Sequence, residues 1–157
     1  MLWVVTDGSE NPRLALEDDL GALSETIEAA YGKYLTRMDR RPEPMLQDLR
    51  PHIESENAWV VGRPIRGLMC LIAAEESLLI EIVAVDPSAQ GTGLGRRLMD
   101  FAQEQARQKG LTRLWLYTNE VMTENLSLYT HLGYREFSRR REAGYNRIFM
   151  EKLLAPV

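Results

Sequence analysis

An apolar strand that leads into a glycine-rich loop and an amphipathic helix constrains the fold of this 157-residue chain most strongly. Residues Leu78–Val85 read Leu-Leu-Ile-Glu-Ile-Val-Ala-Val, a run that is apolar on both faces apart from Glu81. Strands of this kind lie in the centre of a sheet whose two faces are covered by helices. After a proline and three glycines, an apolar stripe over Gly93–Lys109 predicts a helix, with Gly110 in the position that commonly ends one. The segment therefore predicts a central strand followed directly by a covering helix.

The patterns on either side of this segment complete a mixed α/β sheet in one domain. Apolar residues at steps of three and four predict a helix that begins near Asp18 and continues loosely to Leu35 or Met38, and a short helix follows around Met45–Ile53. Turn clusters separate the other elements. The further expected strands are Leu2–Thr6, Ala58–Val61, Leu68–Ala74, Leu114–Thr118, Tyr134–Arg139 and Arg147–Leu153, and the further helix is Thr123–Leu132. The predicted order is β-α-α-β-β-β-α-β-α-β-β, in a single domain over residues 1–157.

The composition excludes several classes of protein. With 45% hydrophobic and 27% charged residues, the chain suits a globular domain, and no apolar run is long enough to span a bilayer. It contains one cysteine, Cys70, so no disulfide forms within the chain. No basic and then apolar leader opens the sequence, because Met1–Thr6 runs into acidic residues. We expect a cytoplasmic protein with no membrane association.

Charge divides the chain into two unlike halves. Residues 1–89 carry 8 Lys and Arg against 16 Asp and Glu, whereas residues 90–157 carry 11 against 7. The overall charge of −4 argues against a general nucleic-acid binder. The basic half favours an anionic ligand and the acidic half a cationic one, although charged runs are more often solvated surface.

The glycine-rich loop is a candidate anion site. Gly91, Gly93 and Gly95 would let a ligand approach the backbone, and the first amides of the following helix have no partner within it. These donors and the positive end of the helix dipole suit a phosphate group, to which Arg96 and Arg97 could add contacts. The alternative is a tight turn that serves packing alone. The spacing fits neither a P-loop nor the G-x-G-x-x-G fingerprint of dinucleotide folds.

Two motifs resemble those of the GNAT acetyltransferase superfamily. Gln90, Gly93 and Gly95 match the Gln/Arg-x-x-Gly-x-Gly/Ala pattern of the family's acetyl-coenzyme A loop. The run Leu128-Tyr129-Thr130-His131-Leu132-Gly133-Tyr134 resembles the family's Leu-Tyr-x-x-Leu-Gly-Phe/Tyr, where its second helix ends. The order of elements also agrees from Leu2 to Leu153, so the resemblance covers nearly the whole chain. It implies a fold in which two central strands splay apart.

The resemblance implies an acetyl-CoA site. In the family, the loop amides hold the pyrophosphate of the coenzyme, and the strand before the loop offers main-chain groups to its pantetheine arm. Many members carry an asparagine seven residues before the tyrosine, where this chain has Met122, so we expect Asn125 to make that contact, with Asn119 as a turn residue. The residues expected to bind the coenzyme are Val83, Ala84, Val85, Gln90, Gly91, Thr92, Gly93, Leu94, Gly95, Arg96 and Asn125.

The resemblance also implies roles in catalysis and acceptor binding. Tyr129 stands where family members often have the acid that protonates the departing thiolate, although such a tyrosine can simply pack its ring. Glu81 is a candidate base for the substrate ammonium, directly or through a water; the alternative is a carboxylate bonded to a neighbouring element. Tyr31, Tyr34 and Arg37 fall in the region that lines the acceptor pocket in the family, with surface residues as the alternative.

Together the motifs predict an N-acetyltransferase that moves an acetyl group from acetyl-CoA to a primary amine by direct attack in a ternary complex. The acidic N-terminal half favours a cationic acceptor, but small-molecule, peptide and protein amines all stay open. A non-catalytic acyl-CoA-binding regulatory module on the same fold is the main alternative, and an unrelated nucleotide-binding domain is another. The spacing of His52, His131 and Cys70 predicts no metal site. The C-terminal strands could pair across a homodimer.

Overall fold

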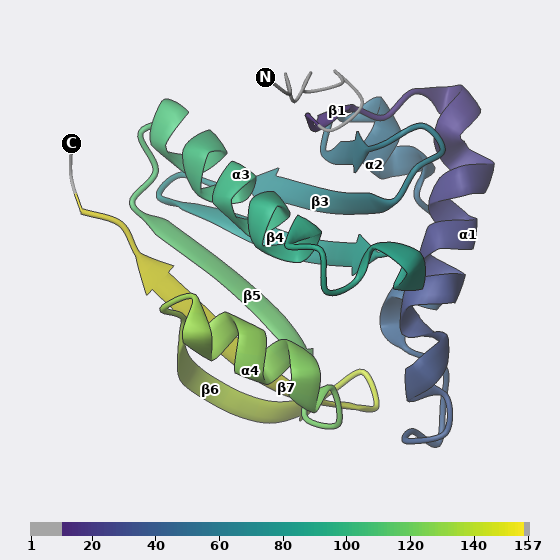
Figure 1. Cartoon of the computed structure of the whole chain (residues 1–157). Helices are drawn as coiled ribbons and strands as arrows, with labels where there is room; N and C mark the ends of the chain where they lie inside the picture. The colour runs from purple at the N-terminus through teal and green to yellow at the C-terminus, as the bar shows by residue number, and fades with distance from the viewer. Residues whose placement is uncertain (1–10, 156–157) are drawn as a thin grey trace, which may run out of the picture.

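The computed structural model describes residues 11–155 and shows a seven-stranded mixed sheet with helices on both faces (Figure 1). The helices are α1 (Leu20–Tyr31), α2 (Arg50–Glu54), α3 (Leu94–Gln108) and α4 (Thr123–His131). The strands are β1 (Arg13–Leu14), β2 (Ala58–Val61), β3 (Gly67–Ala73), β4 (Ser77–Val85), β5 (Arg113–Asn119), β6 (Arg135–Glu142) and β7 (Tyr145–Leu153). Short 3-10 turns lie at Glu17–Asp19, Gly32–Tyr34, Glu43–Leu46 and Pro87–Ala89. The expected mixed α/β sheet is confirmed.

The first half of the chain differs from expectation in detail. The strand expected over Leu2–Thr6 lies outside the described residues. The first helix ends at Tyr31 and continues only as a 3-10 turn. The single helix expected around Met45–Ile53 is a 3-10 turn and the short α2, because Gln47 between them is extended, with a ψ of 142°. Because of this break, the Gln47 side chain contacts Glu81 of the sheet instead of lying on the surface of a helix.

The two central strands separate partway along their length. The sheet has the order β1-β2-β3-β4-β5-β7-β6, and β4 and β5 are its parallel pair among the described residues. Their ladder runs from Ser77 opposite Arg113 to Ile80 opposite Leu116 and then stops, although β4 continues to Val85. In Figure 1 the two strands diverge from this point toward α1 and the tip of α4. The splayed central pair implied by the family resemblance is therefore present.

A bulge in β4 lies at the point where the strands separate. Cys70 of β3 pairs with Ile82 and Leu71 pairs with Ile80, so Glu81 is an extra residue without a partner in this ladder. A bulge bends its strand, and the extra residue moves the following side chains to the opposite face. Leu78 and Ile80 accordingly pack in the core cluster under α3, whereas Ile82 and Ala84 pack in the cluster under α1.

These two clusters hold the helices against opposite faces of the sheet. The first joins α3 and α4 to the sheet, and it includes Leu98, Ala102, Leu114 and Tyr129. The second joins α1 to the other face, and it includes Leu23 and Ile27. In this arrangement the divergent ends of β4 and β5 lie between α1, α3 and α4. Within residues 11–155, no helix is long and apolar enough to cross a membrane.

Candidate active site

The loop between β4 and α3 places the helix N-terminus at the end of the divergent strand. Asp86 accepts hydrogen bonds from the amide and hydroxyl of Ser88, at 3.0 and 2.7 Å, and so fixes the turn after β4. Gly91 and Gly93 have φ values of 80° and 88°, which side chains other than glycine rarely adopt. Gly93 is the N-cap of α3, so the next amides have no intrahelical partners and are available to a ligand.

A cleft of about 410 Å³ lies beside this loop. We call it the main cleft; β4, the loop and α3 form one side of it, and α1 and α4 form the other. A Cβ atom added at Gly91 or Gly93 would meet nothing within 4 Å, so the loop leaves its backbone open to the cleft. The lining residues are Ala30, Tyr31, Lys33, Tyr34, Val83, Ala84, Val85, Gln90, Gly91, Gly93, Gly95, Arg96, Met99, Glu124, Asn125, Leu128 and Tyr129.

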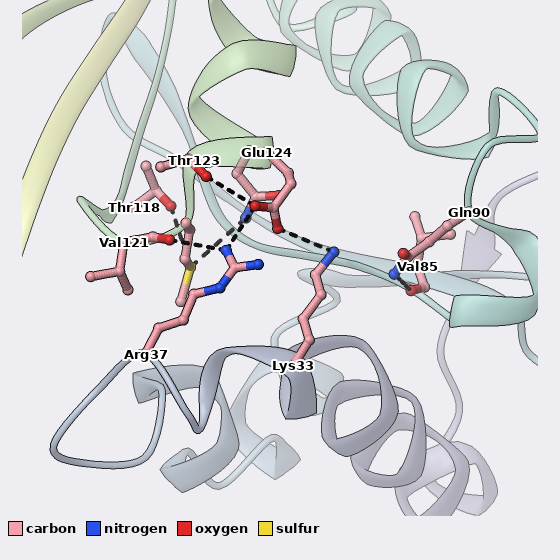
Figure 2. Close-up of polar contacts among 10 residues, drawn as sticks. Lys33, Arg37, Val85, Gln90, Thr118, Val121, Thr123 and Glu124 are labelled. Atoms are coloured by element: carbon pink, nitrogen blue, oxygen red, sulfur yellow. Dashed lines mark hydrogen bonds and ion pairs between the residues drawn. The ribbon is translucent and has the colours of Figure 1, made fainter.

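Polar contacts join the two sides of the main cleft at its mouth, as Figure 2 shows. Lys33, in the 3-10 turn after α1, and Arg37, three residues beyond that turn, both reach Glu124 at the start of α4, at 3.5 and 2.7 Å. Arg37 also donates to the carbonyl of Val121 at 3.2 Å. These groups are exposed, so each ion pair adds little stability, but together they connect α1 with α4.

Tyr129 lies on the α4 side of the main cleft. Its side chain is 4% exposed, and burial raises the pKa of its phenol well above the usual range, with the neighbouring Tyr31, Tyr34 and Tyr134 adding to the shift. The hydroxyl is consequently protonated throughout the neutral pH range. This is the form in which a phenol can donate a proton to a ligand in the cleft.

Tyr31 forms a wall that the main cleft shares with a second pocket. Its hydroxyl donates to the carbonyl of Val83 at 3.0 Å, and its ring lines both cavities. Tyr34, one turn later, lies under Lys33 and Arg37, whose charges are 5.2 and 5.3 Å from its ring centre. Burial and then the Glu124 carboxylate raise the pKa of Tyr34 to about 12.

The second pocket has a volume of about 50 Å³ and lies on the Glu81 side of Tyr31. Glu81, whose side chain is 15% exposed, receives a hydrogen bond on Oε1 from the Gln47 amide at 3.2 Å. Its Oε2 lies 3.3 Å from Nε2 of His52, yet no hydrogen bond of good geometry reaches that buried oxygen. One carboxylate oxygen is therefore held in place, and the other has unused accepting capacity.

The far wall of the second pocket carries a partly buried ion-pair network. Arg147 of β7 binds both oxygens of Glu43, at 2.6 and 2.7 Å, and also donates to Glu142 at 2.8 Å. Its guanidinium lies 4.5 Å from the ring centre of Tyr117. Burial, followed by the Glu43 and Glu81 carboxylates, raises the pKa of Tyr117 to about 12. The negative potential of the carboxylates thus extends across this pocket.

The structure brings most of the residues expected from the sequence to one place. All the expected coenzyme residues except two line the main cleft, as do Tyr129, Tyr31 and Tyr34. Thr92 turns away and donates its hydroxyl to the carbonyl of Ala89. Leu94 is 3% exposed and packs in the core under α3, so a ligand could reach its main chain but not its side chain.

Two further residues differ in placement from the rest. Glu81 lines the second pocket, whereas Tyr129 lines the main cleft, and Tyr31 lines both. Arg37 lines neither cavity and serves the contact with Glu124. The assignment of both residues to catalysis or acceptor binding stays a prediction.

Sequence reasoning missed the residues that surround Glu81. These residues come from three segments, because Glu43 and Gln47 precede α2, His52 lies in α2 and Arg147 lies in β7, and no local motif connects them. Of these residues, Arg147 alone could have been noticed in the sequence. An arginine in the largely apolar run Tyr-Asn-Arg-Ile-Phe-Met is as unusual as Glu81 in its own strand. Over the described residues, no group of three His, Cys, Asp or Glu side chains is placed to hold a metal ion.

Comparison with known proteins identifies the family. A family model described as an acetyltransferase (GNAT) domain matches residues 54–136, which is more than half of the chain. The uncharacterized N-acetyltransferase YjgM of Escherichia coli is 30% identical over 132 residues, covering 78% of this chain and 79% of that protein. The Escherichia coli [ribosomal protein bS18]-alanine N-acetyltransferase is 34% identical over 70 residues, 45% of this chain and 47% of that enzyme.

Solved structures agree on the fold. The PaiA N-acetyltransferase of Thermoplasma acidophilum, in complex with coenzyme A, has a TM-score of 0.72 at 14% identity and covers 91% of this chain and 98% of its own. The putative acetyltransferase yncA of Salmonella typhimurium, with acetyl-CoA, has a TM-score of 0.69 at 17% identity, with coverages of 94% and 95%. The family match and the relative aligned across most of the chain lead to one conclusion: the chain belongs to the GNAT superfamily of N-acetyltransferases.

Proposed function

We propose that the protein transfers the acetyl group of acetyl-CoA to a primary amine by direct attack in a ternary complex. One observation carries this proposal: the main cleft and the second pocket meet at Tyr31, where β4 and β5 have separated. A coenzyme in the cleft and an amine in the pocket would reach each other there. Tyr129 lies on the cleft side of this wall and Glu81 on the pocket side.

The chemistry of the main cleft fits the coenzyme. Its pyrophosphate suits the free amides that follow Gly93, the dipole of α3 and the positive charge of Arg96. We assign the pantetheine arm to the main chain of Val83–Val85, the part of β4 that is not paired with β5. Asn125 lines the same cleft and is assigned to the coenzyme as well.

The second pocket suits the acceptor. An ammonium group would approach the Glu81 carboxylate, which lines the pocket, and Glu81, or a water it holds, would take its proton. The pocket presents two carboxylates, Glu43 and Glu81, against the single charge of Arg147. This balance supports a cationic acceptor.

The bonds and protons of the transfer then balance. The neutral amine forms a C–N bond to the acetyl carbon while the C–S bond breaks. Tyr129, which its burial keeps protonated, donates a proton to the departing sulfur. The nitrogen then loses its second proton, which passes, directly or through water, to the Tyr129 phenolate and restores the phenol. A main-chain N–H within Val83–Val85 would stabilise the negative charge that develops on the acetyl oxygen.

We also propose a cytoplasmic location, which the burial of the single cysteine, Cys70, as a free thiol supports. For a homodimer, we propose pairing through β6, because β6 is an outer strand of the sheet. The arginines Arg139, Arg140 and Arg141 on β6 would oppose such pairing, so dimerisation requires a partner surface that neutralises them.

The test is release of free coenzyme A thiol from acetyl-CoA with a panel of primary amines. Tyr129→Phe is expected to lower kcat about 100-fold or more without weakening coenzyme binding. Tyr134→Phe is the matched control, because Tyr134 is also a buried tyrosine, with its ring centre 6.1 Å away, but does not line the cleft. It should leave kcat unchanged.

Glu81→Gln is expected to lower turnover, since glutamine cannot accept the proton. Glu136→Gln, an exposed change on β6, is its control. Coenzyme binding without turnover on any amine would instead indicate the non-catalytic binding module. An absence of coenzyme binding would contradict the assignment of the main cleft.

A further inference from the structure

The segment between α1 and α2 forms one wall of the second pocket. We call residues 40–47 the strap; Glu43, Pro44 and Gln47 are its contributions to the wall. The facing wall belongs to β5 and β7, including Tyr117. The width of the pocket therefore depends on how firmly the strap is held against the β6–β7 hairpin, about a hundred residues later in the chain.

Arg40, at the start of the strap, contacts this hairpin. It donates to the carbonyl of Ala143 at 2.8 Å, and its guanidinium lies 4.9 Å from the ring centre of Tyr145. A Cβ atom added at Gly144 would lie 1.6 Å from Nη1 of Arg40, so glycine at the hairpin turn leaves the space that the guanidinium occupies. The hairpin turn thus provides a space that fits the Arg40 guanidinium at the start of the strap.

Two further contacts hold the strap from the pocket side. The hydroxyl of Tyr145 donates to the carbonyl of Arg41 at 2.6 Å. One nitrogen of Arg147, Nη2, donates to both oxygens of Glu43, at 2.6 and 2.7 Å, and so holds this carboxylate of the strap close to β7. Because Tyr145 and Arg147 also line the pocket, the residues that fix the strap are themselves part of the wall.

The pocket that results is narrow. A volume of about 50 Å³ has room for roughly three to five water-sized groups, compared with about 410 Å³ for the main cleft. A volume of this size suits the end of an unbranched chain that carries an ammonium group. A substituent on the carbon next to the nitrogen would need room at the wall near Tyr31, where the strap and the facing strands cannot separate without breaking the contacts above.

We propose that Arg40, Tyr145 and Arg147 determine acceptor specificity by fixing the width of the second pocket. The pocket then selects an unbranched primary ammonium, R–CH2–NH3⁺, over an amine branched at the carbon next to nitrogen, which includes the α-amine of most peptide N-termini. This inference rests on the proposed acetyl transfer.

The charges of the pocket agree with this acceptor class. The rings of Tyr31, Tyr117 and Tyr145 line it, and aromatic faces attract ammonium groups. Arg147 is already bound by Glu43 and Glu142, so an acceptor with its own carboxylate would have to displace one of them. A simple alkylammonium needs no such displacement.

The decisive comparison uses n-butylamine and sec-butylamine, which have the same atoms and charge and differ in branching next to the nitrogen. For the wild-type protein, kcat/KM from thiol release should favour n-butylamine at least about tenfold. The double variant Arg40→Gln/Tyr145→Phe removes two of the fixing contacts and should reduce this preference to about threefold or less. Arg41→Gln is the matched control, because the Arg41 side chain pairs with Glu28 on α1 and the Arg41 carbonyl is kept.

Each result decides the question. Equal use of both amines by the wild type, or an unchanged preference in the folded double variant, would overturn the inference. Calorimetric titration of the two amines into the coenzyme A complex separates it from the proposed function. If n-butylamine binds selectively but is not acetylated, the transfer reaction is refuted and the proposed selectivity for unbranched amines still holds. If the two amines bind equally, the proposed selectivity is wrong.

Two unbranched acceptors, 1,5-diaminopentane and an N-terminally acetylated lysine peptide, then distinguish a free amine from a lysine side chain.

Discussion

The hydroxyl of Tyr31 donates to the main-chain carbonyl of Val83 at 3.0 Å, which connects α1 to the part of β4 that has separated from β5. Sheet pairing no longer fixes this end of β4 on the β5 side, so the tyrosine supplies a contact from the helix. Tyr31 also lines both the main cleft and the second pocket. One side chain therefore supports the strand and shapes both cavities.

Replacing Tyr31 with phenylalanine should affect both of these roles. The ring would stay, but the carbonyl of Val83 would lose its partner, at a cost of about 1 kcal/mol in the free energy of unfolding. We also expect a higher KM for acetyl-CoA, since the displaced strand end lines its cleft. Urea denaturation and thiol-release kinetics measure the two effects. Wild-type stability in this variant would show that the hydrogen bond is not maintained in solution.

Gly93→Ala should weaken coenzyme binding through the backbone. The φ of 88° at Gly93 is strained for alanine by about 1–2 kcal/mol, although nothing lies within 4 Å of the added Cβ. Lower thermal stability and a higher dissociation constant for coenzyme A are expected, measured by calorimetry. Gly21→Ala in α1 is the control: it also has open space, its φ is helical, and alanine there should stabilise the helix by about 0.5–1 kcal/mol without changing coenzyme affinity.

The acid sensitivity of the protein should depend in part on Glu124. Arg37, and then Thr123, lower the pKa of this carboxyl from 4.5 to about 2. Because the folded-state pKa lies below the unfolded one, the stabilisation is present above about pH 4.5 and is lost as the pH falls toward about 2. Glu124→Gln should therefore lose less stability than the wild type between about pH 6 and about pH 3.

Urea midpoints at the two pH values check this prediction, with Glu75→Gln in the exposed β3–β4 turn as the control. Salt should shrink the difference between the wild type and Glu124→Gln, because the Arg37–Glu124 pair is exposed and its attraction is screened. Parallel pH dependence in the wild type and the variant would mean that the ion pair does not persist.

The single cysteine, Cys70, should not react with thiol reagents in the folded protein. Burial, and then the nearby Glu81 carboxylate, raise the pKa of Cys70 to about 12, so almost no thiolate exists near neutral pH. A disulfide-exchange reagent should detect no thiol before unfolding and one per chain afterwards. Rapid reaction of the native protein would contradict the burial of Cys70, and it would also add a background to thiol-release assays.

The sequence-based predictions succeeded where the information lies within one segment. The strand Leu78–Val85, the glycines from Gly91 to Gly95 and the helix that carries Tyr129 are each specified by residues a few positions apart. Periodicity and turn chemistry act over the same short range, so the sheet and the cleft-lining loop could be expected in advance. The family resemblance then related the separate segments to one another.

The surroundings of Glu81 could not be expected in this way. Gln47 and His52 contact it from the strap and from α2, and their positions depend on the break in the helix expected around Met45–Ile53. The bulge at Glu81 depends on the register with β3, which a single-strand pattern does not contain. An apolar run with one carboxylate signals an unusual residue, but it does not say which face that residue takes.

The bulge has a consequence for how this protein can change over evolution. Before the bulge, Leu78 and Ile80 pack in the core under α3 and border neither cavity. Substitutions of similar shape there should therefore change stability alone. Beyond it, Ile82 and Ala84 pack under α1 while Val83–Val85 border the main cleft, so each change acts on folding and ligand at once. An insertion or deletion in this second half would exchange inward and outward side chains a second time. New acceptor preferences should therefore arise by altering the strap and the β6–β7 hairpin, while β4 keeps its length.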